Sequence, residues 1–134
     1  MLTENDVVDL VSSELQRRGF KIEQQLSTTE TGIDIEATSP EGVYYGIEAK
    51  GATSSKVESS RYGKEFNKSQ VKTHIGMALI AAFRLKNKRQ NAEAIIALPD
   101  NTNHRSLVAE MHKPLSDSGI KVWLVNRDGI EKYI

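Results

Sequence analysis

The stretch that most constrains the fold is GIDIEATSPEGVYYGIEAKG, residues 32–51. Its apolar residues alternate with other residues, as they do in two strands that are each buried on one face. The segment 40–42, Pro-Glu-Gly, suits a three-residue hairpin loop with Gly42 at the position that needs a positive φ. Acids and a lysine occupy the other strand positions, where an ordinary sheet would carry Thr or Val.

A hairpin with this loop pairs residues whose numbers sum to 82. One side then carries three apolar pairs: Ile33–Ala49, Ile35–Ile47 and Ala37–Tyr45. On the other side Asp34 opposes Glu48, and Lys50 lies diagonal to Asp34, within reach of a long side chain. A slip of one residue would mix apolar and charged side chains on both faces, so the pattern favours this register.

Two carboxylates that face each other across a hairpin repel unless a positive charge lies between them. A divalent cation is one candidate, because Mg²⁺ in proteins binds one or two carboxylates and keeps several waters. The alternative is that Lys50 alone neutralises Asp34 and Glu48 in a surface salt-bridge cluster. Glu36 shares this face but lies further from Glu48, so we expect it to have a peripheral role.

The first predicted helix, residues 4–18, carries a further acid. Its apolar stripe contains Val7, Leu10, Val11 and Leu15. At 100° per residue Glu14 falls between Leu10 and Val7, which predicts that its side chain points toward the sheet. A carboxylate there is costly unless it is paired or bound to a cation. The alternative is an ordinary ion pair with Arg18, one turn further along.

The remaining elements follow from periodicity, caps and breakers. Strands are predicted at 20–26, 32–39, 43–50, 92–99 and 120–126, with a last short strand after a turn at 126–129. Helices are predicted at 67–86 and 103–113, the second limited by Pro114, which gives the order α-β-β-β-α-β-α-β-β. The helix at 67–86 presents one apolar face, formed by Val71, Ile75, Leu79, Ala82 and Phe83.

The length of 134 residues suits one compact domain that spans residues 1–134. The chain has no cysteine, which excludes disulfides, thiolate metal sites and cysteine nucleophiles. No apolar run approaches the length of a membrane span, and the N-terminus does not resemble a signal peptide. We therefore expect a cytoplasmic protein without a membrane partner.

Charge is distributed unevenly along the chain. Residues 1–49 hold ten acids and three bases, whereas residues 50–90 hold two acids and ten bases. This segregation indicates a polyanionic partner, although a solvated helix face is an equal alternative. The candidate phosphate contacts are Lys56, Arg61, Lys64, Lys68 and Lys72. The three histidines show no zinc-ligand spacing, so we expect surface positions for His74, His104 and His112.

These motifs resemble those of the PD-(D/E)XK nuclease superfamily. The signature of that superfamily is an acid followed, after a variable gap, by acid-x-Lys on two neighbouring strands; here Asp34 matches the first part and Glu48-Ala49-Lys50 the second. An acid on the first helix, matched by Glu14, is similar to the archaeal Holliday-junction-resolvase branch. Many members carry a Gln on the helix after the signature, where this chain has Gln70.

The resemblance implies a restriction-endonuclease-like α/β core, α-β-β-β-α-β, with a central mixed sheet flanked by helices. It also implies a Mg²⁺-dependent deoxyribonuclease, an endonuclease of DNA processing, repair, recombination or restriction, in which Mn²⁺ can substitute for Mg²⁺. It further implies a homodimer, because small members often cut two strands by symmetry. The alternatives are a catalytically inert nucleic-acid-binding or assembly module on the same fold, and an interaction protein.

Residue roles follow from the same resemblance. Asp34, Glu48 and the backbone carbonyl of Ala49 would hold the metal, and Glu14 would hold a second metal or a metal-bound water. We expect Lys50 to act as a cation that positions the water and stabilises developing charge, because neighbouring carboxylates favour its charged form. Gln70 would orient Lys50 or the nucleophile.

Overall fold

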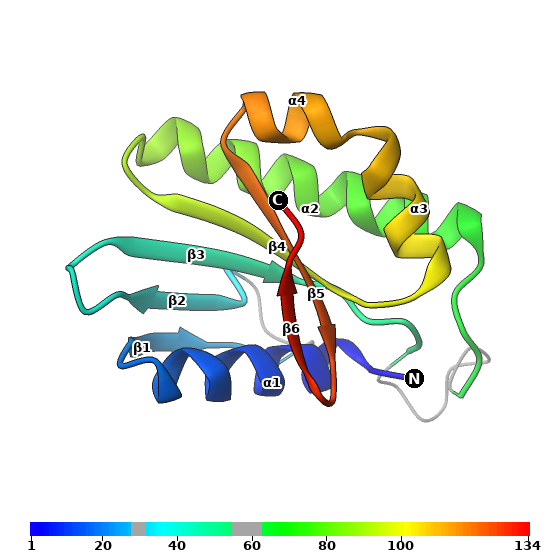
Figure 1. The fold of residues 1–134 in the computed structure, drawn as a ribbon, viewed down its shortest axis with the longest axis horizontal. Helices are drawn as coiled ribbons and strands as arrows, with labels where there is room; N and C mark the ends of the chain where they lie inside the picture. Colours follow the sequence, from blue (N-terminus) through cyan, green and yellow to red (C-terminus); the bar gives the residue numbers. More distant parts are fainter. Residues whose placement is uncertain (28–31, 55–62) are drawn as a thin grey trace.

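The computed structural model describes residues 1–27, 32–54 and 63–134. Its elements are, in chain order, α1 (Glu4–Arg17), β1 (Lys21–Gln25), β2 (Ile35–Thr38), β3 (Tyr44–Ala49), α2 (Lys68–Lys88), β4 (Glu93–Pro99), α3 (Thr102–Glu110), α4 (His112–Asp117), β5 (Ile120–Asn126) and β6 (Gly129–Lys132). The strands form one sheet in the order β1-β2-β3-β4-β5-β6 (Figure 1). Strands β3, β4 and β5 are parallel, and the other neighbours pair antiparallel.

Helix α1 covers one face of the sheet, and α2, α3 and α4 cover the other (Figure 1). The buried strand β4 contributes to both layers, because successive side chains of a strand point to opposite faces. Ile95 and Ala97 pack toward α1, and Ile96 and Leu98 pack toward α2. Glu48 pairs with Ile96 across the parallel ladder, so its side chain lies on the α2 face.

The hairpin register predicted from the sequence is confirmed where β2 and β3 pair. Ile35 pairs with Ile47 and Ala37 with Tyr45. Gly42 has a φ of +85°, as the three-residue loop requires. The apolar face is fully buried, since Ile35 and Ile47 each expose 0% of their surface. The charged positions therefore share the opposite face of the same two strands.

The predicted single helix at 103–113 is wrong in its extent. The chain forms two helices here, α3 and α4, which meet at Met111. Pro114 does not end a helix but lies in the first turn of α4. A proline is tolerated there because the first-turn N–H groups have no partner within the helix.

The predicted apolar face of α2 is also wrong at one position. Phe83 is 49% exposed, whereas Ala78 and Leu85 are buried. At 100° per residue, Phe83 lies about 120° around the helix from Val71, and Leu85 lies about 40° from it. The sheet therefore covers Leu85 and leaves Phe83 toward solvent. In the part of the chain that the structure describes, every helix is too short or too polar to cross a lipid bilayer.

Candidate active site

The structure brings Asp34 and Glu48 together, as the hairpin register predicts. Asp34 lies directly before β2 and is 8% exposed, and Glu48 lies near the end of β3. The Ala49 N–H donates a hydrogen bond of 2.8 Å to Asp34 Oδ2. The charge of Asp34 acts on the carboxyl group of the half-buried Glu48, so the two acids lie close together.

Burial is the main reason why both carboxyl groups hold a proton more tightly than usual. Burial, together with the Asp34 charge, raises the pKa of Glu48 to about 7, and the charge of Lys50 opposes the rise. Burial also raises the pKa of Asp34, against the hydrogen bond from Ala49 and the charge of Lys50. Two acids that together hold a proton near neutral pH form a site that a divalent cation can occupy in place of that proton.

Lys50 follows β3 directly, and its N–H donates to the Ala97 carbonyl at 3.0 Å. Its charge lowers the pKa of both Asp34 and Glu48, so its side chain lies near them. Among the described residues, however, no ion pair joins Lys50 to either acid within 4.0 Å. The structure therefore does not support the alternative of a closed salt-bridge cluster.

The prediction that Glu14 points toward these acids is wrong. Glu14 forms ion pairs with Arg17 and with Arg18, the latter at 2.6 Å from Nε to Oε2. It lines a small hollow beside the β5–β6 turn, far along α1 from the hairpin acids. The third acid of the site is Glu4, at the start of α1. Burial raises the pKa of Glu4, and the charge of Asp34 raises it further.

Helical periodicity explains why Glu4 faces inward. Glu4 lies on one line with Val8, Val11 and Leu15, at spacings of four, seven and eleven residues, and these three side chains are buried. This spacing was the signal available in the sequence. An acid in the first turn of a helix is also favoured by the helix dipole, so an acid at this position does not by itself indicate a site.

Gly51 permits the close approach of α1 to this end of β3. A Cβ atom at Gly51 would collide with the backbone nitrogen of Glu4 and the carbonyl carbon of Thr3. Thr3 forms an isolated parallel bridge with Thr53, and the Ala52 N–H donates to the Leu2 carbonyl at 2.7 Å. Glu4 therefore reaches Asp34 and Lys50 because the residue after Lys50 has no side chain.

Gln70 occupies a different role from the one predicted. It forms a capping box with Asn67 at the start of α2: the Asn67 N–H donates to Gln70 Oε1 at 2.9 Å, and the Gln70 N–H donates to Asn67 Oδ1 at 3.0 Å. One turn further on, His74 is the α2 residue whose pKa responds to Lys50. Burial lowers the pKa of His74, and the Lys50 charge lowers it further.

The prediction of a surface position is wrong for His104, which is fully buried in α3. Its Nδ1 lies 2.8 Å from Oδ1 of Asn101, the residue that caps α3. Burial, together with the neighbouring His74, lowers the pKa of His104 to about 4. His104 therefore packs as a neutral ring within the helix layer.

Glu36, which was expected to be peripheral, is held by a neighbouring tyrosine. The Tyr44 hydroxyl donates to Glu36 Oε1 at 2.6 Å, and the Arg89 guanidinium lies 4.0 Å from the centre of the Tyr44 ring. This cluster lies at the opposite end of β3 from Lys50. Glu36 is thus engaged away from the Asp34–Glu48 pair.

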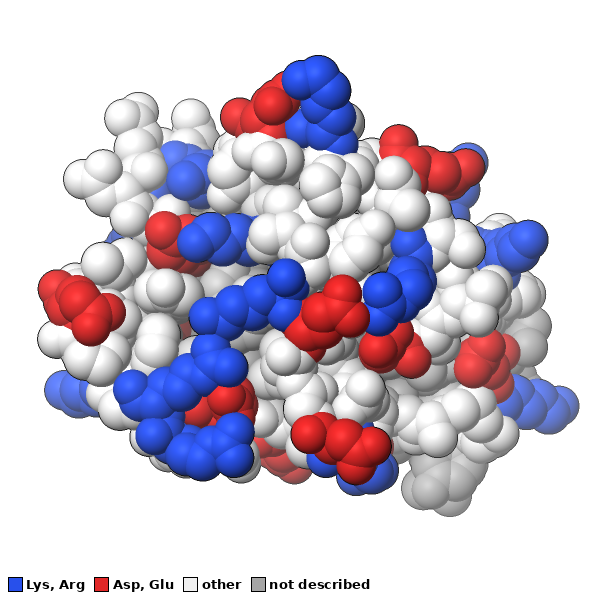
Figure 2. Space-filling view, viewed as in Figure 1, with Lys and Arg blue, Asp and Glu red and all other residues white. Residues whose placement is uncertain are grey.

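The candidate phosphate contacts lie around the start of α2 or outside the described residues. Lys56 and Arg61 fall outside them, and Lys64 is exposed. Lys68 and Lys72 line a groove between α2 and α3 with Asn103. On the face shown in Figure 2, basic side chains gather around the C-terminal end of α1. Over the rest of that face, acidic and basic side chains are interspersed.

The donor set fits a hard divalent cation. Asp34 and Glu48 supply two carboxylates, which with waters is a typical Mg²⁺ ligand set. The N–H and C=O groups of one strand residue point toward the same neighbouring strand. The Ala49 N–H donates to Asp34, so the Ala49 carbonyl also points toward Asp34. Within the described ranges, no three His, Asp or Glu side chains converge as a complete metal-binding group. The remaining ligands would therefore be water, backbone and substrate oxygens.

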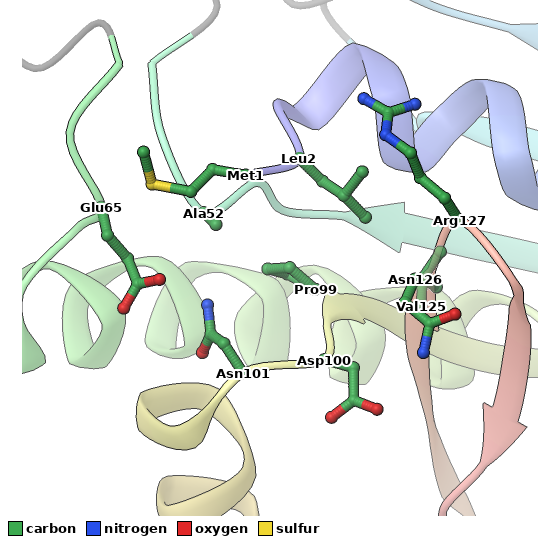
Figure 3. A pocket seen from close by; sticks show the side chains of 10 residues that line it. All are labelled: Met1, Leu2, Ala52, Glu65, Pro99, Asp100, Asn101, Val125, Asn126 and Arg127. Carbon is green, nitrogen blue, oxygen red and sulfur yellow. The ribbon is translucent and has the colours of Figure 1, made fainter.

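A second hollow, of about 370 Å³, lies at the C-terminal ends of β4 and β5 (Figure 3). Met1, Leu2 and Pro99 line it, and Arg127 lies at one end with its side chain directed toward α1 (Figure 3). One of its two acids, Asp100, is held by Arg105 through two hydrogen bonds of 3.0 Å. This hollow contains none of the hairpin acids, so it is a weaker candidate for the site.

The raised pKa of Glu48 predicts how stability depends on pH. Because the folded state holds the proton up to about pH 7, against an ordinary pKa of 4.5, the metal-free protein should lose stability as the pH rises through this window. Glu48→Gln removes that loss. We expect the variant to be more stable than wild type at pH 7.5 by about 1 kcal/mol, reduced by partial solvent screening, and similar at pH 4.5.

Urea unfolding in EDTA at the two pH values measures this difference. The comparison with Glu48→Gln cancels the contributions of other groups that titrate in the same range. A stability difference that does not change between pH 4.5 and pH 7.5 would contradict the raised pKa of Glu48.

No family model and no curated protein matches this chain. Among solved structures, the chain is similar to the crystal structure of an XisH family protein from Nostoc punctiforme PCC 73102. The TM-score is 0.60 and the sequence identity 18%, over 96% of this chain and 98% of that chain. At this identity the likeness shows the fold alone.

The mixed six-stranded sheet flanked by helices is consistent with the restriction-endonuclease-like fold, as predicted. The likeness to the XisH family protein supports this fold and no particular activity. It does not support the archaeal junction-resolvase branch. The misplaced Glu14, on which that branch rested, agrees with this correction.

Proposed function

We propose that this protein is a metal-dependent nuclease that hydrolyses phosphodiester bonds of DNA. The observation that carries the proposal is the pairing of the buried Asp34 with the half-buried Glu48, neither of which forms an ion pair with Lys50. Keeping two such acids together is costly without a cation. A nuclease-like fold is the context in which such a pair would serve phosphodiester hydrolysis.

Asp34, Glu48 and the Ala49 carbonyl would hold Mg²⁺, or Mn²⁺ in its place. The bound ion would polarise the scissile phosphate and make a bound water more acidic. Lys50 would hold that water in position and offset the charge that develops on the phosphate. Glu4 would add negative charge on the α1 side and help to retain the cation.

A cleavage screen tests the proposal. Single-stranded, duplex, nicked and branched DNA, with RNA as a further substrate, would be incubated with Mg²⁺ and with Mn²⁺. A calorimetric titration with the metal distinguishes the nuclease from an inert nucleic-acid-binding module, because the inert module has no need of the cation. Absence of both metal binding and cleavage would leave the inert module as the better explanation.

Contacts to the DNA backbone should make binding dependent on salt. Neutralising Lys68 and Lys72 together, as Lys→Gln, should weaken DNA binding and reduce the slope of log K against log salt by up to about 2, because each phosphate contact releases counterions. The matched control neutralises the exposed Lys21 and Lys113, which lie on β1 and α4. Equal salt slopes for the two double variants would show that Lys68 and Lys72 make no specific phosphate contact.

A further inference from the structure

A groove of about 550 Å³ borders the hairpin acids on the α2 side. It is lined by Glu48, Ile33 and the C-terminal half of α2, including Phe83, Arg84, Asn87 and Lys88. A volume of this size is typical of a pocket for a small ligand. A docked protein would instead bury a large area of surface. The groove opens beside Glu48, where the scissile phosphate would lie.

The groove offers an aromatic side chain to a ligand. Phe83 is 49% exposed, in the C-terminal half of a helix whose other face is buried. Because Phe83 also lines the groove, its exposed ring is available to a ligand that enters there. A flat π-face is the feature on which unpaired nucleobases stack, with little dependence on sequence.

The charges of the groove favour an anion. Arg84 and Lys88 lie one turn apart on α2, and neither forms an ion pair with a described acid. The whole of α2 contains no acidic residue. A second copy that packed α2 against α2 would bring like charges together, which disfavours it. Asn87 adds an amide that can both donate to and accept from a base edge.

We propose that this groove binds an unpaired nucleotide next to the bond that is cut. Its base would stack on Phe83, and its phosphates would contact Arg84 and Lys88. The inference rests on the proposed nuclease function and names its substrate class: a single strand, or a duplex with an unpaired segment at the site. Bases inside a duplex are stacked on both faces and cannot offer a face to Phe83 without being flipped out.

Fluorescence anisotropy in EDTA at low salt tests the groove without cleavage. The probes are a labelled oligo(dT) of about 15 nucleotides and a blunt duplex of the same length. We expect wild type to bind the single strand more tightly than the duplex. Phe83→Ala should weaken binding of the single strand about tenfold and change binding of the duplex little. Phe83→Trp should bind the single strand as wild type does. The matched control is Met77→Ala, which removes an apolar side chain that is 57% exposed on α2 outside the groove.

Three results would overturn the inference: tighter binding of the duplex, unchanged single-strand binding by Phe83→Ala, or an equal loss in Met77→Ala. Sedimentation velocity gives a fourth such result: a dimer that dissociates in both Phe83→Ala and Met77→Ala would mean that this surface is an interface between copies. Cleavage by Asp34→Asn reports on the nuclease function separately. If Asp34→Asn is inactive and Phe83→Ala binds the single strand normally, only the groove assignment fails. If Asp34→Asn still cleaves DNA and Phe83→Ala binds the single strand more weakly, only the proposed chemistry fails.

Discussion

Replacing Asp34 with Asn, or Glu48 with Gln, should abolish Mg²⁺-dependent cleavage and leave the fold intact. Each substitution removes one of the two carboxylates that would hold the cation, so we expect a loss of roughly 10²–10³-fold or more in rate. Removing one acid also relieves the repulsion within the pair. The metal-free variants should therefore be as stable as wild type, or more so. Single-turnover cleavage and urea unfolding measure the two effects.

Glu36→Gln is the matched control for this experiment. Glu36 lies on the same face of the hairpin, but its carboxylate accepts from the Tyr44 hydroxyl at 2.6 Å, away from the pair. We expect this variant to retain most of the cleavage activity. Wild-type turnover by Asp34→Asn or Glu48→Gln would mean that these acids do not hold a catalytic metal.

The position of the acid pair could be predicted because it depends on local rules. The three-residue loop and the period of two set the register, and any other register would bury charge on the apolar face. The observed pairs Ile35–Ile47 and Ala37–Tyr45 follow that register. Asp34 and Glu48 then come together without any information about the helices.

The contributions of the helices could not be predicted in the same way, because they depend on how each helix docks. Glu14 lies at the edge of the α1 stripe, and a small rotation decides whether such a residue faces the sheet or its neighbours. Arg17 and Arg18 provide local partners that hold it outside the site. Glu4 reaches the site only because Gly51 lets α1 approach, a tertiary contact between two distant segments.

The two acids of α1 allow a sharp test of this correction. Glu4→Gln should weaken Mg²⁺ or Mn²⁺ binding about tenfold, as the loss of supporting groups around a metal commonly does, and should lower cleavage at limiting metal. The physical reason is that the Glu4 charge acts on Asp34 and Glu48. Glu14→Gln should leave metal affinity and cleavage unchanged, and should cost less than about 1 kcal/mol of stability through its exposed arginine partners.

Isothermal titration with Mn²⁺, paired with cleavage measured across Mg²⁺ concentrations, distinguishes the two variants. Both substitutions are isosteric, both lie on α1 and both remove one negative charge, so a general effect of charge on metal binding would alter them equally. A tenfold loss confined to Glu4→Gln would place the start of α1 in the site. A loss confined to Glu14→Gln, or shared equally by the two variants, would contradict this assignment, because the carboxylate of Glu14 is held by Arg17 and Arg18 rather than by the hairpin acids.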